Sequence, residues 1–361
     1  MAENTFQKSD GMNYAPQGKP APVCEKGEFV FAAAALDHGH IYGQTGGLVK
    51  AGGQLKWIYD SDLTRAKNFQ EKYPEAKVAR SLDEILEDPS VQMVASGAIP
   101  SERCALGLRV MEAGKDYFTD KAPFTTLEQL ASARVAVAKT NRRYMVYFSE
   151  RLHVECAVFA GELISNGAIG KVVNVIGLGP HRLNAASRPE WFFQKKEYGG
   201  ILTDIGSHQF EQFLAFSGST DATVEHARVA NVCHPEYPEL EDFGEATLLG
   251  NNGASNHVRV DWLTPDGLST WGDGRTTILG TKGYIELRKY VNVATQKTGD
   301  HLFLVNDEGE QHLELAGKVG FPFFGQLILD CLTRTENAMT QEHAFKAAEL
   351  CLLAQEKADA S

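Results

Sequence analysis

The chain has 361 residues, of which 43% are hydrophobic, so it is long enough to bury the cores of two globular domains. Its formal net charge of −12 disfavours a nucleic-acid partner or an anionic membrane surface. Six cysteines without any C-x-x-C spacing indicate reduced thiols rather than a disulfide framework or a zinc site. No segment has the apolar length of a membrane span or the apolar core of a secretory signal, so we expect a cytoplasmic protein.

The first 150 residues show a repeating pattern of strands and helices. Residues 1–27 are polar and contain several prolines and glycines, which predicts an extended arm; a disordered tail is the alternative. The alternation that follows predicts a parallel, doubly wound sheet over residues 28–149. The expected strands are 28–36, 55–59, 77–79, 91–95, 116–119 and 144–149, and the expected helices lie within 37–53, 65–73, 81–86, 102–113 and 127–140.

The turn after the first strand, within residues 37–53, stands where a dinucleotide-binding fold places its phosphate loop. The G-x-G-x-x-G fingerprint is not intact there, because Ala35 stands near the position of the first glycine. Asp60 ends the second strand, at about the ~20-residue distance expected for a carboxylate that binds the ribose hydroxyls; an ordinary turn residue is the alternative. His38 and His40 form a pair of potential metal ligands, but the spacing supplies no third, so we expect them to line the cofactor turn and expect no metal.

The pattern changes after about residue 150, and residues 150–361 are predicted to form an α+β domain with a large, mostly antiparallel sheet. The expected strands are 172–177, 223–232, 243–249, 256–261, 276–279, 283–287 and 302–305, and the expected helices include 154–166, 325–333 and 343–357. A loop dense in arginine and aromatic residues follows the first of these strands. Its His181, Arg182, Arg188 and Trp191 could line a sugar site, with loop packing as the alternative.

The segment Gly199–Gln209 begins with two adjacent glycines, and a largely apolar run follows that carries Asp204 and His208, four residues apart. If the segment is helical and continues to Phe216, these two side chains lie on one face. A carboxylate beside an imidazole is a usable proton-transfer pair, because the carboxylate fixes the ring and stabilises its charged form. The alternative is a helix-capping aspartate beside a structural histidine.

Several of these features together resemble the glucose–fructose oxidoreductase, inositol dehydrogenase and rhizopine-catabolism (Gfo/Idh/MocA) family. They are the glycine turn, Asp60, the Asp120-Lys121 pair after the strand at 116–119, and Gly-Gly-x-x-x-Asp-x-Gly-x-His from Gly199. The family's Glu-Lys-Pro motif is matched by Asp-Lys-Ala here, with the proline displaced by one residue. The resemblance implies a Rossmann-like NAD-binding domain over 28–149 and a substrate and oligomerisation domain over 150–361.

The resemblance further implies an NAD(H)-dependent oxidoreductase that acts on a sugar, a polyol or a related cyclic secondary alcohol. His208 is the expected general base, Asp204 would orient its ring, and Lys121 would stabilise the developing oxygen anion. We expect Lys121 and His208 to meet in the crevice at the carboxyl ends of the parallel strands. The residues expected to bind the cofactor are Asp37, His38, Gly39, His40, Ile41, Asp60, Pro100, Asp120 and Lys121.

Two other functions stay open at this point. One is a redox-neutral lyase or glycosidase that uses bound NAD transiently, and the other is a non-catalytic nucleotide-binding sensor. NAD is expected rather than NADP, because Asp60 would repel a 2′-phosphate. A homodimer or homotetramer is expected, because the antiparallel sheet should leave one apolar face uncovered.

Overall fold

The structure, a computed structural model, describes residues 22–360 and divides them into two compact units. The N-terminal unit contains residues 22–147 and 321–345, and the C-terminal unit contains 148–320 and 346–360. Most of the arm expected at 1–27 lies outside the described residues. Among the described helices, none combines the length and the apolar character needed to cross a membrane.

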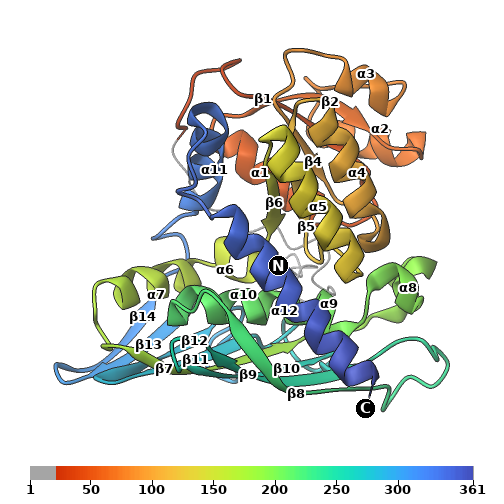
Figure 1. The fold of residues 1–361 in the computed structure, drawn as a ribbon. Coiled ribbons are helices and arrows are strands. Elements are labelled where there is room, and N and C mark those ends of the chain that lie inside the picture. The colour runs from red at the N-terminus through yellow and green to blue at the C-terminus, as the bar shows by residue number, and fades with distance from the viewer. Residues whose placement is uncertain (1–21, 361) are drawn as a thin grey trace, which may run out of the picture. The chain divides into compact units, whose positions relative to one another are not determined.

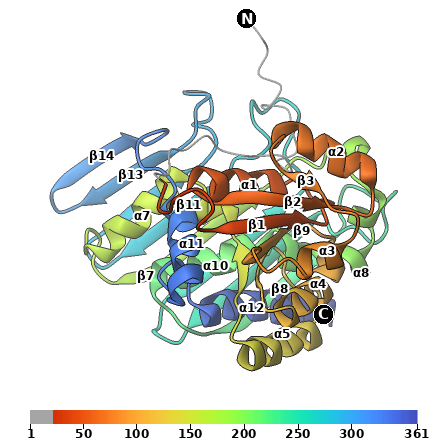
Figure 2. The ribbon, with the colours of Figure 1, turned by 90° about the horizontal axis from the view of Figure 1, so that it is seen from above.

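The N-terminal unit is built on a six-stranded sheet in the order β3-β2-β1-β4-β5-β6, in which all neighbouring strands are parallel. Figure 2 shows β3, β2 and β1 side by side. The central strands β1 and β4 are buried along their whole length, as expected for a sheet covered on both faces. This confirms the predicted doubly wound sheet. The strands are β1 (Val30–Ala34), β2 (Gln54–Tyr59), β3 (Lys77–Val78), β4 (Met93–Ser96), β5 (Asp116–Asp120) and β6 (Tyr144–Tyr147).

The helices of this unit follow the strands in the predicted order. They are α1 (Ile41–Lys50), α2 (Leu63–Lys72), α3 (Leu82–Leu86), α4 (Pro100–Glu112) and α5 (Leu127–Thr140). Asp62, Ser81 and Thr126 cap α2, α3 and α5 through side-chain oxygens that accept backbone N–H groups. Each capping residue stands just before an apolar-periodic segment, so the starts of these three helices follow from local sequence.

One helix, α11 (Pro322–Thr333), belongs to the N-terminal unit although the sequence placed it in the second domain. Its two adjacent phenylalanines explain the difference. The ring of Phe323 lies 5.9 Å from that of Phe118 on β5. Phe324 packs so closely on α1 that a Cβ on Gly47 would overlap its ring. An apolar helix needs a partner, and the sequence pattern could not show which sheet supplies it.

The C-terminal unit contains an eight-stranded sheet in the order β14-β13-β12-β11-β7-β10-β9-β8. Only β7 and β10 pair in parallel among these strands, so the sheet is mostly antiparallel, as predicted. Figure 1 shows α7 (Glu155–Ser165) and α10 (Gly206–Ser217) on one face of this sheet. The strands are β7 (Val172–Pro180), β8 (Ala222–Ala230), β9 (Phe243–Gly250), β10 (Ser255–Asp261), β11 (Arg275–Gly280), β12 (Gly283–Arg288), β13 (His301–Asn306) and β14 (Gly309–Glu314).

Several short elements of this unit were not predicted. Strand β14 is polar and mostly exposed, so it lacks the apolar alternation that marks the other strands. The others are the single-turn or 3₁₀ segments α6 (Ser149–Leu152), η2 (Ala185–Ser187), η3 (Glu190–Phe193) and α8 (Lys195–Tyr198). The helix expected from Gly199 to Phe216 is divided at Ile205 into α9 (Ile201–Asp204) and α10.

The two glycines before α9 are required by the backbone. Gly199 and Gly200 have φ values of 86° and 94°, in the region that favours glycine. A Cβ on Gly200 would overlap the side chain of Gln355 on α12 (Gln341–Asp359). That side chain accepts a 3.1 Å hydrogen bond from the N–H of Leu202 and so holds the first turn of α9. The glycine pair therefore fixes the direction in which the following helices leave the turn.

Candidate active site

The residues expected to bind the cofactor lie together at one edge of the N-terminal sheet. Residues 37–41 follow β1, Asp60 follows β2, and Pro100 begins α4 after β4. Asp120 and Lys121 stand at the carboxyl end of β5. Strands β1 and β4 are neighbours although β2 and β3 separate them in the chain, so the strand order reverses there. Dinucleotide folds bind their ligand in the crevice at this switch point.

The turn between β1 and α1 fits the phosphates of a dinucleotide. Ala35, near the place of the first fingerprint glycine, has φ 53°, in the left-handed region that favours glycine. Helix α1 carries no acidic residue in its first turn, so the positive end of its dipole is available to an anion. A Cβ on Gly97 would lie 2.7 Å from the carbonyl oxygen of His38, so the loop after β4 closes tightly on this turn.

The ends of β1 and β2 carry carboxylates joined by one arginine. The side chain of Asp60 is 1% exposed, and its oxygens accept hydrogen bonds of 2.7 Å each from the N–H groups of Leu36 and Asp62. Nη1 of Arg65 donates a 3.3 Å hydrogen bond to Oδ2 of Asp60. The same nitrogen also donates a hydrogen bond to Oδ1 of Asp37 in the turn. Burial raises the pKa of Asp37, and Arg65 opposes this effect. Asp60 thus shapes the loop, whereas Asp37 is the more exposed of the two carboxylates.

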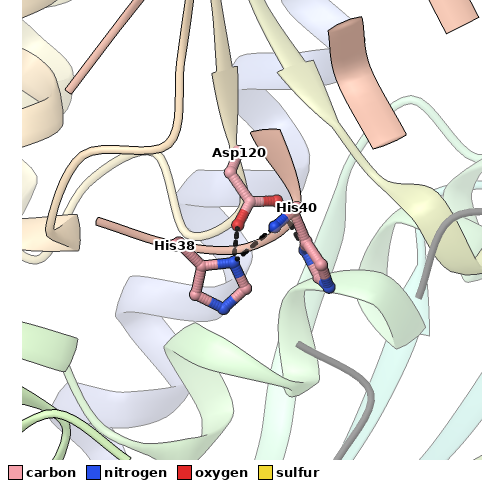
Figure 3. A group of neighbouring side chains, drawn as sticks. All are labelled: His38, His40 and Asp120. Carbon is pink, nitrogen blue, oxygen red and sulfur yellow. Dashed lines mark hydrogen bonds and ion pairs between the residues drawn. The ribbon is translucent and has the colours of Figure 1, made fainter. Parts of the chain in front are cut away.

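Asp120 lies between two imidazoles, as Figure 3 shows. Its Oδ1 is 3.0 Å from Nδ1 of His40, and its Oδ2 is 3.1 Å from Nδ1 of His38. Nδ1 of His38 is also 3.2 Å from the backbone N–H of His40, but a ring nitrogen is a donor or an acceptor, not both. An ionised Asp120 can only accept hydrogen bonds, so Nδ1 carries a proton in both rings.

A buried arginine organises the turn that contains Lys121. Arg103 on α4 is fully buried, and its guanidinium donates to the carbonyl oxygens of Ala98 at 2.7 Å and Ala122 at 3.0 Å. It also donates to the carbonyl oxygen of Lys121 and lies 3.4 Å from Oδ2 of Asp120. The peptide bond between Lys121 and Ala122 is cis. Arg103 therefore fixes the backbone on which the predicted catalytic lysine stands.

The charges of this cluster favour a neutral His38. Burial acts to raise the pKa of Asp120, but His40, His38 and Arg103 outweigh it and hold the pKa well below its usual range. Burial and the neighbouring His40 lower the pKa of His38 well below its ordinary value. The positive charges of Lys121 and Arg103 act in the same direction, although Asp120 opposes them. His38 is therefore a neutral imidazole near pH 7.

Asp120 joins His38 and His40 as a third potential metal ligand, which the spacing of the two histidines in the sequence did not indicate. One ligand atom each from His38, His40 and Asp120 lies within 4.8 Å of the others, so geometry alone would admit a metal ion. The cations Arg103 and Lys121 act on these groups and would oppose a further positive charge. The arrangement fits a hydrogen-bonded lining of the cofactor turn better than a metal centre.

A second set of potential ligands lies on the hairpin of β13 and β14. Nδ1 of His301 is 3.0 Å from Nε2 of His312, and Glu314 is within reach of both rings. Nε2 of His301 contacts the carbonyl oxygen of Thr298 at 3.0 Å, and Glu314 accepts a 2.6 Å hydrogen bond from Gln296. A metal ion bound here would have to replace hydrogen bonds that are already made.

The C-terminal unit contains a buried carboxylate with a similar set of partners. Glu150 on α6 is 2% exposed, and its Oε2 accepts hydrogen bonds from Nζ of Lys289 at 2.8 Å and Nε2 of Gln209 at 2.9 Å. Lys289, directly after β12, is fully buried. Nε2 of His181, directly after β7, lies 3.9 Å from Oε1 of Glu150. Three separate segments thus converge on one carboxylate.

The predicted general base belongs to this cluster. His208 is 2% exposed and directly precedes Gln209 on α10. Burial acts to raise the pKa of Glu150, but Lys289, His208 and His181 lower it to about 2. A positive charge on the His208 ring and the negative charge of Glu150 therefore stabilise each other.

Asp204 lies one helical turn before His208, as the sequence predicted. It ends α9 and is 6% exposed. The N–H of His208 donates to the carbonyl oxygen of Ile205 at 3.2 Å, so the chain stays helical across the division between α9 and α10. Both residues are buried polar groups on a nearly continuous helical segment.

The first two residues expected to line a substrate site have different surroundings. Nδ1–H of His181 donates to the carbonyl oxygen of Gly179 at 3.1 Å, and its ring lies 4.5 Å from that of Trp271. Its Nε2 therefore faces Glu150. Arg182 is 5% exposed and donates at 3.0 Å to the carbonyl oxygen of Pro265, so it ties two loops together.

The other two expected substrate residues pack within the same loop. Arg188 is 8% exposed, and its Nε donates to the carbonyl oxygen of Leu183 at 2.9 Å. Its guanidinium lies 4.4 Å from the ring centre of Phe192 and 4.8 Å from that of Trp262. Trp191 is partly exposed and lies 5.9 Å from Phe192. Of these side chains, the arginines have a clear packing role, and their contact with substrate stays a prediction.

Sequence reasoning did not single out three buried charged residues of these clusters: Arg103, Glu150 and Lys289. A signal existed for two of them, because Glu150 and Lys289 come just after β6 and β12. Asp60 and Asp120 were noticed because they stand at strand ends in the same way. For Arg103 there was no such signal, since it lies in the first turn of an ordinary amphipathic helix.

A parallel sheet with a phosphate-type turn at its switch point, joined to a mostly antiparallel α+β unit, defines a Rossmann-fold class of dinucleotide-binding oxidoreductases. The chain belongs to the Gfo/Idh/MocA family. The model described as "Oxidoreductase family, NAD-binding Rossmann fold" matches residues 32–148. The model described as "GFO/IDH/MocA C-terminal domain" matches residues 158–286. The family that the sequence resembles is thereby confirmed.

Among curated relatives, D-xylose dehydrogenase from Paenarthrobacter nicotinovorans is 27% identical over 150 residues, which cover 40% of this chain and 38% of that protein. The scyllo-inositol 2-dehydrogenase (NAD(+)) from Bacillus subtilis is 25% identical over 65% of this chain and 66% of that protein. These matches thus span less than two thirds of the relatives' own lengths.

Solved structures cover more of the chain. A putative oxidoreductase from Erwinia carotovora atroseptica is 50% identical, with a TM-score of 0.89 over 91% of this chain and 98% of that one. A levoglucosan dehydrogenase in complex with NADH and levoglucosan is 18% identical, with a TM-score of 0.75 over 92% of this chain and 97% of that one. The second likeness shows a shared fold.

Proposed function

We propose that this protein is a cytoplasmic, NAD(H)-dependent dehydrogenase that oxidises a secondary alcohol of a sugar, a polyol or a related cyclic substrate. The observation that carries the proposal is the buried His208, one helical turn after Asp204 and coupled to the Glu150 cluster, in a chain of this family. The relatives named for D-xylose and scyllo-inositol support a hydroxylated substrate.

Each of the predicted site residues would have its own role in binding or catalysis. The loop at 37–41 and the start of α1 would hold the pyrophosphate, and Asp37 and Asp60 lie where a ribose is expected. Bound nicotinamide would supply the hydride acceptor. His208 would accept the proton of the substrate hydroxyl, and Asp204 would orient the ring. Lys121 would stabilise the negative charge that develops on the substrate oxygen.

We expect NAD(H) rather than NADP(H). Three carboxylates, those of Asp37, Asp60 and Asp62, stand at the ends of β1 and β2 beside one cation, Arg65. A 2′-phosphate brought to this place would meet a net negative charge, whereas ribose hydroxyls can donate hydrogen bonds to a carboxylate.

We also expect a homodimer or a homotetramer. The face of the C-terminal sheet opposite to α10 carries partly exposed apolar residues on several strands, such as Ile176, Leu249 and Leu279. An apolar surface spread over several strands is typical of an interface between subunits. A monomer in sedimentation at micromolar protein would contradict this expectation.

The direct test is NADH formation with a panel of sugars, polyols and their acids. The proposal expects NADH to accumulate in proportion to oxidised product with at least one of them. Product without NADH would favour a redox-neutral lyase or glycosidase. Tight NAD(H) binding without turnover on any member, together with unaltered ligand response in His208 and Lys121 variants, would favour a sensor.

A further inference from the structure

Two histidines and a glutamate on the hairpin of β13 and β14 share one face of the sheet. In the strand register His301 lies directly opposite Glu314, and Phe303 lies directly opposite His312. Side chains two residues apart on a strand point to the same side, so His301, His312 and Glu314 stand together. The pair of His301 and Glu314 lies at the end of the hairpin away from its turn.

The ligand atoms of these three residues are close enough to hold one metal ion. Nδ1 of His301 is 3.0 Å from Nε2 of His312, and one ligand atom from each of the three residues lies within 4.8 Å of the others. In a tetrahedral zinc site with Zn–N bonds of about 2.0–2.1 Å, two ligand nitrogens lie about 3.3 Å apart. The two rings therefore need to separate only slightly to admit the ion.

Hydrogen bonds from outside the cluster hold two of the ligands in suitable orientations. His301 is fully buried, and its Nε2–H donates to the carbonyl oxygen of Thr298 at 3.0 Å, so in a neutral ring Nδ1 carries the lone pair. Oε1 of Glu314 accepts a 2.6 Å hydrogen bond from Gln296, and the carboxylate has a second oxygen to offer. Histidine and carboxylate ligands of metal sites usually have such partners on their other polar atom.

We propose that His301, His312 and Glu314 form a binding site for Zn²⁺ or a similar divalent transition metal, separate from the proposed oxidoreductase site. The ion would take the place of the hydrogen bond between the two rings, while the bonds to Thr298 and from Gln296 support the ligands. His312 is exposed, so its ring can carry the proton on Nδ1 and present Nε2 to the ion. Two imidazoles and one carboxylate suit Zn²⁺ better than Mg²⁺ or Ca²⁺, which prefer oxygen ligands.

The charges near this hairpin are compatible with a bound cation. Arg288 on β12 is paired with Glu286, to which its Nε donates at 2.8 Å. Lys318 acts on Glu314, but it is exposed, so solvent screens its charge. The cluster at the cofactor turn differs in this respect, because it contains the fully buried Arg103.

A metal ion here would fasten an edge strand that has few apolar contacts of its own. Strand β14 is polar and mostly exposed, and it stands at the end of the sheet order beside β13. The proposed ligands join the start of β13 to the end of β14, opposite the turn that connects the two strands. The ion is therefore expected to stabilise the hairpin and to take no part in the reaction.

The test is a calorimetric titration of tag-free, full-length protein with Zn²⁺ after dialysis against a chelator. His312→Gln removes an exposed ligand without disturbing the core, so we expect the affinity to fall at least about tenfold, and Glu314→Gln should also weaken binding. Zn²⁺ should raise the midpoint of thermal unfolding of the wild type, because it binds the folded hairpin, and should raise that of His312→Gln much less.

The matched control is His226→Gln, which removes an exposed histidine of the same unit whose Nε2 lies 3.9 Å from Oε1 of Glu245. This replacement should leave the affinity for Zn²⁺ unchanged. His38→Asn reports on the histidine cluster of the cofactor turn and should also leave it unchanged. The inference would be overturned if the wild type did not bind Zn²⁺, if folded His312→Gln bound it equally well, or if only His38→Asn lost it. None of these readings depends on the proposed function.

Discussion

The two units contain buried clusters of the same composition that are arranged differently. In the N-terminal unit, Asp120 is surrounded by His38, His40 and the fully buried Arg103. In the C-terminal unit, Glu150 is surrounded by His181, His208 and the fully buried Lys289. Each cluster therefore has one carboxylate, two imidazoles and one fully buried cation, and Lys121 also acts on the first cluster.

The two clusters differ in the side chains that bond to the oxygens of the carboxylate. Both oxygens of Asp120 are occupied by imidazole Nδ1 atoms at 3.0 and 3.1 Å, and its arginine mainly anchors backbone carbonyls. Oε2 of Glu150 is instead occupied by Lys289 and Gln209, so its histidines are not both fixed by it. The first arrangement fixes both rings through their Nδ1 atoms and keeps His38 neutral, whereas Oε2 in the second arrangement holds Lys289 and Gln209. We therefore expect proton transfer in the second cluster.

The largest expected effect concerns the histidines themselves. His208→Ala should lower turnover by roughly 10²–10⁴-fold, the usual loss for a general base. Affinity for NAD(H) should stay near that of the wild type, because the expected cofactor residues lie in the N-terminal unit. His38→Asn, the matched change in the other cluster, should leave the acidic limb of the pH profile where it is. Near-normal turnover of a folded His208→Ala variant would contradict the assignment of proton transfer to the Glu150 cluster rather than to the Asp120 cluster.

Arg103, the fully buried cation beside Asp120, should contribute to the free energy of unfolding. Arg103→Met leaves Asp120 buried without its cation and frees several backbone carbonyls, so the free energy of unfolding should fall by about 3–5 kcal/mol. The control is Arg109→Met on the same helix, where the arginine pairs with Asp83 at the surface. An exposed pair of this kind contributes about 0–1 kcal/mol. Equal losses in chemical denaturation would contradict the structural role given to Arg103.

Because the pKa of His38 is lowered in the folded protein, the free energy of unfolding should depend on pH. The pKa of His38 is lower in the folded protein than in the unfolded chain, so the unfolded chain binds more protons below pH ~6.5. Stability should therefore fall between pH 7 and pH 5, by up to about 2 kcal/mol. Burial raises the pKa of Asp300 to about 6, which acts in the opposite direction over this range. The test is thus the difference between wild type and His38→Asn, and no difference would contradict the neutral ring.

The smallest expected effect concerns the cofactor's ribose. Asp37→Ser removes one carboxylate and releases Arg65 from one of its partners, so affinity for NADP(H) should rise about tenfold, or ~1.4 kcal/mol. The control is Asp83→Ser, a surface carboxylate of the same unit. Titration of both cofactors measures the preference. Wild-type protein that already binds NADP(H) more tightly would contradict the assignment of this region.

Much of the fold follows from local sequence. Apolar strands alternating with capped amphipathic helices predict the parallel sheet, and two consecutive glycines with positive φ mark the turn before α9. Elements without a local pattern were missed, such as the polar strand β14 and the single turn α6. The placement of α11 depends on aromatic packing with distant residues, which periodicity does not encode.

The site was predictable in part for the same reason. Asp60, Asp120 and His208 stand at recognisable places, at strand ends and in a motif. Lys289 meets Glu150 across 139 residues, and Arg103 bonds backbone atoms that the chain places only after folding. Such partners are fixed by tertiary contacts, so the sequence could indicate chemistry at each position but not which charges compensate one another.

The central claim is that hydride passes from the substrate to NAD while His208 takes the proton. The most direct measurement uses the sugar or polyol that the wild-type enzyme oxidises, deuterated at the carbon that carries the reacting hydroxyl. We expect each NADH formed to carry one deuterium, as shown by mass spectrometry, and His208→Ala to form the same labelled product far more slowly. Unlabelled NADH, or product that forms while NAD stays oxidised, would contradict the account.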